Sequence, residues 1–173
     1  PRPSHADFTA HAKYHGFEDY RGGGHFSGRI TAALVAAGAI VIPALREMGI
    51  YVGTYIKQIS DTKFSSLPHD RETLLAVAES DYGILSESEL AAMKETVESA
   101  AERGDSVGGV LETAIIGLPS GLGEPWFDGV ESQLARAVFG IPAVKGVEFG
   151  AGFAASEMLG SQYSDKAYTT EQG

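Results

Sequence analysis

The stretch Asp19–Arg29, which reads DYRGGGHFSGR, constrains the fold more than any other part of the sequence. Glycine is used mainly where the backbone turns with positive φ or approaches a ligand closely, so Gly22–Gly24 predict a tight turn rather than a packed segment. Ser27 is suited to cap a helix, and an apolar helical pattern follows it at once. A helix that starts here would direct free N–H groups and the positive end of its dipole toward Arg21 and Arg29, which predicts an anion or phosphate site.

A purely structural turn is the alternative interpretation of this stretch, because Gly-rich turns are common ahead of helices. The glycine spacing matches neither the Walker pattern nor the dinucleotide fingerprint. The stretch by itself leaves both interpretations open.

Composition indicates a single globular domain over residues 1–173, because 43% of the residues are hydrophobic and 21% are charged. A formal charge of −10 argues against a nucleic-acid surface. The absence of cysteine excludes disulfides and thiolate chemistry, and we expect no metal site. No apolar run reaches the ~18 residues that span a bilayer, and no signal-peptide core is present, so we expect a cytoplasmic protein without a membrane segment.

Apolar periodicity predicts a helix over residues 28–46, with Pro43 as a kink or an end and Gly49 as a stop. Residues 50–59 have the β-branched and aromatic content of a strand, and residues 60–82 indicate a surface loop or short helix.

The second half of the chain predicts further short elements. They are a helix through about Arg103 that Ser86 or Ser88 can cap, with Glu89 placed for a capping box with Ser86, strand structure within 106–118, a helix over 128–139 capped by Asp128 with Glu131, and a short strand over 143–149. Irregular alternation of helices and strands suits the α+β class better than a doubly wound parallel sheet.

Isolated ionisable residues are most simply surface or structural groups, and we interpret His11, His15, His69 and Lys145 in this way. Because Pro3 disfavours the helical conformation before it, residues 1–7 should be extended, with His5 on a loop or strand end.

Five segments form an ordered set. They are Arg2-Pro3-Ser4-His5-Ala6-Asp7, Asp19–Arg29, Gly117–Pro125 with Phe127-Asp128, Ala143-Val144-Lys145-Gly146-Val147-Glu148, and Gly150-Ala151-Gly152-Phe153. In this order and at these separations they resemble chorismate synthase, and the resemblance runs from residue 1 to about residue 160.

The resemblance implies a β-α-β sandwich, in which helices lie between antiparallel sheets, and a homotetramer. It also implies a carbon–oxygen lyase that eliminates phosphate from 5-enolpyruvylshikimate 3-phosphate to give chorismate, with reduced FMN as cofactor. Chorismate synthases are much longer than this chain, which starts without Met and ends in the polar stretch 161–173. We therefore expect a middle segment that lacks the N- and C-terminal parts of the family.

The resemblance also implies roles for individual residues. His5 matches the histidine of an RP-x-HAD motif that is regarded as an acid near the flavin, and Arg21 and Arg29 are placed for phosphate or structural ion pairs. The residues that match flavin-contacting positions are His25, Phe26, Ser27, Pro142 and Ala143. Many relatives have Arg-Ser in place of His25-Phe26 and Asn in place of Pro142, so the charge and hydrogen bond of those side chains are lost here.

Two other interpretations remain open from the sequence. One is a flavin- or phosphate-binding module without catalysis, and the other is a structural fragment that neither binds nor reacts. The sequence does not decide whether the parent protein also reduces its flavin with NADPH. The resemblance also places the Gly-rich loop 117–125 close to the active site, which implies a positioning but no chemical role for Glu124 and the glycines. A purely structural turn is the alternative.

Overall fold

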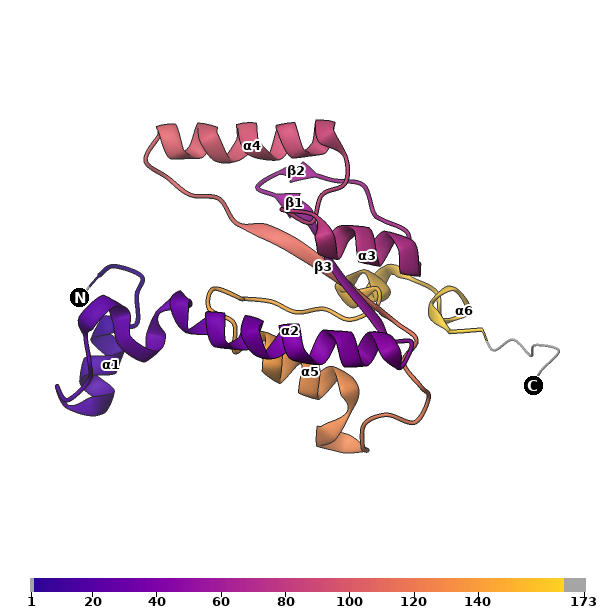
Figure 1. Cartoon of the computed structure of the whole chain (residues 1–173), viewed down its shortest axis with the longest axis horizontal. Helices are drawn as coiled ribbons and strands as arrows, with labels where there is room; N and C mark the ends of the chain where they lie inside the picture. The colour runs from indigo at the N-terminus through magenta and orange to yellow at the C-terminus, as the bar shows by residue number, and fades with distance from the viewer. Residues whose placement is uncertain (1, 167–173) are drawn as a thin grey trace. The chain divides into compact units, whose positions relative to one another are not determined.

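Figure 1 shows the computed structural model of the chain, which describes residues 2–166. Contacts divide the chain into two units. One unit comprises Pro1–Thr31 and Leu122–Gly173, and the other is Ala32–Gly121. The expectation of a single domain stays a prediction. Helices together with an antiparallel sheet confirm the α+β class.

The expected helix after the glycine stretch is confirmed. A short 3₁₀ turn, η2 (Gly28–Ile30), leads into α2 (Thr31–Glu47). Pro43 lies inside α2 and does not end it. Gly49, with φ of 80°, terminates the helix, and the amide of Ile50 donates to the Leu45 carbonyl at 2.9 Å. A positive φ at this position is the usual role of glycine at a helix C-terminus.

The sequence of α2 is apolar on all sides. The stretch Gly28–Glu47 has 20 residues and a mean hydropathy of 1.8, which are the length and composition needed to cross a membrane, and none of it is buried. From the lengths of apolar runs we expected no segment long and apolar enough to span a bilayer. That expectation was wrong for Gly28–Glu47. The same composition is typical of a helix buried in a protein core, and such a helix needs cover that the described residues do not give.

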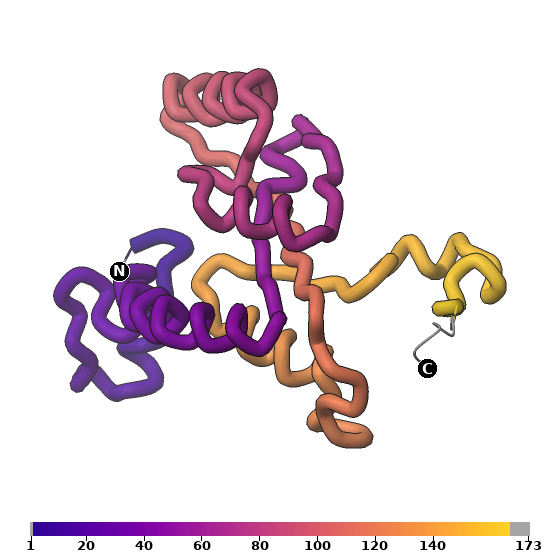
Figure 2. Tube along the Cα trace, turned by 45° about the vertical axis from the view of Figure 1, so that its right-hand side comes forward, coloured from indigo at the N-terminus to yellow at the C-terminus, as the bar shows by residue number. Residues whose placement is uncertain are grey.

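A three-stranded antiparallel sheet organises the Ala32–Gly121 unit. The central strand β1 (Tyr51–Ile59) pairs with β2 (Thr62–Lys63) on one side and with β3 (Gly109–Ile116) on the other. The strands expected over 50–59 and within 106–118 are confirmed. The course of the chain through this unit can be followed by colour in Figure 2.

Helix α3 (Arg71–Glu79) packs on β1 through its buried side chains Leu74 and Val77. Leu74 is only 1% exposed, and a Cβ added to Gly53 would lie 2.8–3.0 Å from it. Gly53 therefore sits in the strand because a side chain there would displace the helix.

Helix α4 (Glu87–Glu102) starts at Ser86, whose hydroxyl accepts from the Glu89 amide at 3.4 Å. The expected capping box is only half formed, because the Glu89 carboxylate instead accepts from the Ser65 amide at 2.8 Å. Buried Met93 of α4 joins Phe64 and Ile84 in a hydrophobic cluster.

The Glu112 side chain is a hydrogen-bonding centre on the same sheet. Glu112 of β3 lies opposite Tyr55 of β1, and the hydroxyl of this buried tyrosine donates to its carboxylate. Lys57 forms an ion pair with the second oxygen, and His69 Nε2 lies 3.3 Å from the first. Burial, followed by the bond to Glu112, raises the pKa of Tyr55.

The other unit is built from short elements. They are α1 (Asp7–Tyr14), η1 (Arg21–Phe26), η3 (Trp126–Asp128), α5 (Val130–Val138), η4 (Gly152–Glu157) and α6 (Gly160–Tyr163). Ala10 is its buried hydrophobic side chain among the described residues. Large side chains such as Trp126 and Phe153 are exposed.

Three expectations for this unit were wrong. Residues 2–6 form a turn, with φ of 62° at Ser4, before α1 begins. Gly129 rather than Asp128 precedes α5, and no side chain caps it, because Asp128 belongs to η3. Residues 143–149 form no strand, since within residues 2–166 the strand pairing involves only β1, β2 and β3.

Replacement of Glu112 tests the polar centre of the sheet. Hydrogen bonds from Lys57, Tyr55 and His69 lower the pKa of Glu112 below its ordinary 4.5. Because the folded-state pKa is the lower one, the stabilisation is present above the unfolded-state pKa and is lost as pH falls through the folded-state value. Thermal unfolding of Glu112→Gln should therefore show a lower melting temperature than wild type at about pH 7, with a gap that narrows below about pH 4.5.

The exposed Glu98 of α4 provides the matched control, and Glu98→Gln should melt like wild type at both pH values. A gap between Glu112→Gln and wild type that is constant from neutral to acid pH would contradict this account.

Candidate functional site

The triple glycine forms the turn that its sequence predicts. Gly22, Gly23 and Gly24 have φ of 58°, 85° and 52°. A Cβ added to Gly23 would lie 2.7 Å from Nη2 of Arg2 and 2.9 Å from Cε1 of His5. The RP-x-HAD motif and the Gly-rich motif, which are separate in sequence, are thus packed against each other.

The His5 ring is held by two charged neighbours. Nη2 of Arg2 lies 3.2 Å from Nδ1 and 3.1 Å from Nε2 of His5, and Asp7 Oδ1 contacts Nδ1 directly. Arg2 also donates to Asp7 from its backbone amide at 2.9 Å and from Nε at 3.1 Å. These bonds hold the pKa of Asp7 well below its usual range, so Asp7 is a carboxylate that accepts a hydrogen bond from the N–H of His5 Nδ1.

The two arginines of the Gly-rich stretch hold the turn itself. The guanidinium of Arg29 donates to the carbonyls of Gly22 and Arg21. Arg21 donates from Nε and Nη2 to the Asp19 carboxylate at 2.8 and 2.9 Å and lowers the pKa of Asp19 to about 2. Of the two roles expected for Arg21, the structure shows the ion pair. A phosphate contact by either arginine stays a prediction.

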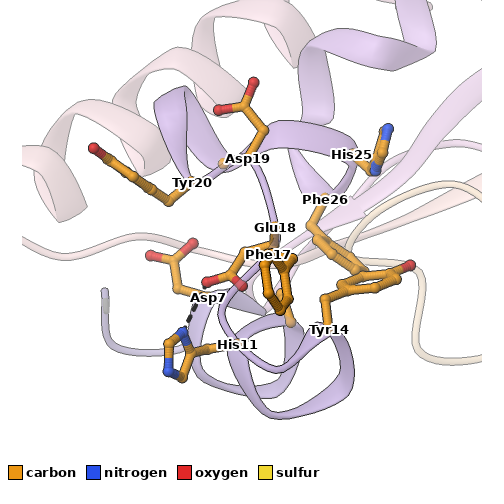
Figure 3. A pocket seen from close by; sticks show the side chains of 11 residues that line it. Asp7, His11, Tyr14, Phe17, Glu18, Asp19, Tyr20, His25 and Phe26 are labelled. Atoms are coloured by element: carbon orange, nitrogen blue, oxygen red, sulfur yellow. Dashed lines mark hydrogen bonds and ion pairs between the residues drawn. The ribbon is translucent and has the colours of Figure 1, made fainter.

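Ser27 caps the helix start as expected, because its hydroxyl accepts from the Arg29 amide at 3.4 Å. His25 and Phe26 precede it and line a cavity of about 580 Å³, which Figure 3 shows from close by. The Phe26 ring lies 6.5 Å from the ring of Tyr14, with 47° between their planes. Three residues expected to contact the flavin therefore follow the glycine turn directly, and two of them open on a cavity.

The other two residues expected to contact the flavin are Pro142 and Ala143. Pro142 and Ala143 lie in a turn, where Ala143 has φ of 69°. Within residues 2–166, no hydrogen bond or ion pair joins them to His5 or to the residues that follow the glycine turn. Lys145 is exposed, as expected for a solvated side chain. The amide of Glu124 donates to the Asp128 carbonyl at 2.9 Å, which fixes the end of the Gly-rich loop.

The cavity also involves residues that the sequence analysis did not select as a site. His11, interpreted above as a surface group, lies 3.0 Å from Glu18 through Nδ1. Aromatic residues Tyr14, Phe17 and Tyr20 line the same cavity. The recurrence of an aromatic residue at every third position of this segment is the signal that identifies this wall in the sequence.

Comparison with known proteins supports what these motifs indicate. The family model described as chorismate synthase matches residues 1–173. The chain belongs to the chorismate synthase family.

Similar proteins in this family come from bacteria and archaea. A chorismate synthase of Dehalococcoides mccartyi is 50% identical over 167 residues, which are 95% of this chain and 45% of the relative. One from Thermococcus kodakarensis is 46% identical over 165 residues, again 95% of this chain and 45% of the relative. The chain thus spans about half the length of these curated relatives.

A solved structure supports the fold. The crystal structure of a chorismate synthase superimposes with a TM-score of 0.86 at 31% identity, covering 96% of this chain and 54% of that one. The α+β fold expected from the sequence is therefore that of chorismate synthase.

Substitution of Gly23 tests the packing of the two motifs. Gly23→Ala places a methyl group against His5 and Arg2 and forces a non-glycine residue into positive φ, which costs about 1–2 kcal/mol. We expect a lower melting temperature and a clear change in the NMR signals of the His5 ring.

Gly28→Ala is the control, because nothing lies within 4 Å of its added Cβ and its φ is not positive. Unchanged His5 signals in Gly23→Ala would show that the two motifs are not in contact in solution.

Proposed function

We propose that the protein to which this chain belongs is a carbon–oxygen lyase, which converts 5-enolpyruvylshikimate 3-phosphate into chorismate in the shikimate pathway of aromatic amino acid biosynthesis. The observation that carries the proposal is the contact of His5 and Arg2 with Gly23, because it joins two motifs of the chorismate synthase family in one site. The family match over residues 1–173 supports the same conclusion.

The reaction is a 1,4-elimination. The bond from carbon to the phosphate oxygen breaks, and phosphate leaves with the bonding electrons. A C–H bond also breaks, a proton is lost, and a second ring double bond forms. Reduced FMN, when bound, supplies an electron to the substrate and regains it, so the overall reaction is redox-neutral.

The residues around the glycine turn fit such a cofactor. Phe26 presents a partly exposed ring to the cavity, Ser27 carries a hydroxyl, and the glycines leave the backbone open to close approach. Arg21 is 81% exposed and paired with the exposed Asp19. Exposed ion pairs are weak, so Arg21 can exchange its carboxylate partner for a phosphate. We propose that His25, Phe26 and Ser27, with Pro142 and Ala143, hold the flavin, and that Arg21 and Arg29 bind phosphate.

His5 is the proposed acid. Asp7 accepts from Nδ1 and so fixes the ring, which leaves Nε2 as the atom that holds or releases a proton. Arg2 keeps the Asp7 carboxylate ionised. Its Nη2 lies 3.1 Å from Nε2, and because a guanidinium can only donate, Arg2 has to move aside before Nε2 carries the acidic proton. This arrangement resembles the general case in which a carboxylate fixes the tautomer and the orientation of a histidine.

The resemblance and the composition support further proposals for the whole protein. We propose a cytoplasmic homotetramer that binds a small-molecule substrate and neither nucleic acid nor membrane, in line with its formal charge of −10. In this proposal α2 is covered by parts of the protein that lie outside this chain. We also propose that the isolated chain forms no chorismate, because it spans 45% of its relatives. A binding module without catalysis is the alternative for the isolated chain.

The activity is tested with the full-length protein under anaerobic conditions. We expect chorismate from 5-enolpyruvylshikimate 3-phosphate only when reduced FMN is present, and none from the 173-residue chain assayed in parallel. Chorismate formation by the full-length protein without any flavin, or inactivity with the flavin kept reduced, would refute the proposal.

The role of His5 is tested by His5→Ala in the full-length protein. Loss of a general acid should lower turnover by about 10²–10⁴-fold, while flavin affinity changes little. His69→Ala, which replaces an exposed histidine of the other unit, should keep wild-type turnover. Near wild-type turnover in His5→Ala would make His5 a structural residue only.

A further inference from the structure

His25 lies at the edge of the cavity described above, and its ring has no carboxylate partner. Among residues 2–166 the ring makes no hydrogen bond and no ion pair, and the side chain is exposed. By contrast, His5 contacts Asp7, and Nδ1 of His11 lies 3.0 Å from Glu18. Figure 3 shows the His25 ring apart from the carboxylates that line the cavity. The His25 ring is therefore available to a ligand.

The other charged groups around the cavity have partners within the protein. The partners are Arg2 with Asp7, His11 with Glu18, Arg21 with Asp19 and, through an aromatic ring, Lys13 with Tyr14. Arg29 donates to the carbonyls of Gly22 and Arg21. The phenols of Tyr14 and Tyr20 carry no charge at neutral pH. Among the described residues, His25 is thus the group beside the glycine turn that changes charge near neutral pH without giving up a partner.

The affinity of this cavity for an anion depends on such a group. The carboxylates of Asp7, Glu18 and Asp19 line the wall, and like charges repel a phosphate at close range. Arg2 and Arg21 offset two of these charges but are themselves held by them. A further positive charge at the edge of the cavity therefore changes the affinity for an anion directly. Histidine is the side chain that gains and loses its charge between about pH 5 and 8.

We propose that His25 makes the binding of the flavin phosphate pH-dependent, because the protonated ring attracts the phosphate and the neutral ring contributes no charge. The inference rests on the function proposed above, in which His25, Phe26 and Ser27 hold the flavin. Since the protonated form is the one that attracts phosphate, this contribution is present at acidic pH and is lost as histidine loses its proton. An arginine at the same position would stay charged over that range, so the histidine gives the site a response to pH that arginine lacks.

The inference is tested by titrating FMN into the full-length protein at about pH 5.5 and about pH 8, while flavin fluorescence is followed. Because the phosphate of FMN itself gains charge near pH 6, wild type is compared with variants at the same pH. His25→Arg is charged at both pH values and His25→Gln at neither. We expect wild type to bind FMN like His25→Arg at the acidic pH and like His25→Gln at about pH 8, where the arginine variant binds about three- to tenfold more tightly.

Riboflavin provides the matched ligand control, because it has the same ring system and no phosphate. Its affinity should be the same for wild type, His25→Arg and His25→Gln at each pH. His69→Gln is the matched protein control, since it replaces an exposed histidine of the other unit, and it should bind FMN like wild type at both pH values. Equal differences among the His25 variants for riboflavin and FMN would overturn the inference, because the effect would then not act on the phosphate.

The outcomes separate this inference from the proposed function. If FMN binds equally to wild type and both His25 variants at each pH, His25 does not contact the phosphate and the inference fails, while the proposed function stands. The inference also fails if wild type follows the same one of the two variants at both pH values. If the full-length protein binds no FMN at either pH, the proposed function fails and the inference fails with it.

Discussion

The close approach of His5 and Arg2 to the backbone of Gly23 is the contact on which the candidate site depends. It requires a residue without Cβ and with positive φ, and both conditions are met by glycine alone at no steric cost. Once the turn is formed, Arg29 binds its carbonyls and Ser27 starts the next helix. The site is thus positioned by a glycine turn against which the side chains of His5 and Arg2 can pack.

The charged side chains around this turn are paired with one another. Arg2 is paired with Asp7 and Arg21 with Asp19, and His11 Nδ1 lies within hydrogen-bond distance of Glu18. In a chain with a formal charge of −10, these local pairs keep positive groups beside the candidate site.

The two units differ in how much of their own core they contain. The Ala32–Gly121 unit buries Tyr55, Leu74, Val77 and Met93 around its sheet. Among residues 2–166, the buried hydrophobic side chain of the other unit is Ala10. Helix α2 exposes apolar residues such as Ile40. Because the chain spans 45% of its relatives, these uncovered apolar surfaces are consistent with a fold that is completed by segments outside it.

The sequence by itself determined the local features. Apolar periodicity predicted α2, β-branched and apolar residue content predicted β1 and β3, and a capping serine predicted α4. The glycine triplet predicted the turn with positive φ. All of these depend on residues close in the chain. The sequence-based prediction failed for residues 143–149, because this strand-like segment has no partner strand among the described residues. It also failed for Asp128, which lies in the 3₁₀ helix η3 and therefore does not cap α5. Only the tertiary structure decided which distant residues meet. The packing of His5 on Gly23, the register that brings Glu112 to Tyr55 and the separation of His25 from the carboxylates of the cavity each depend on an arrangement that no local pattern specifies.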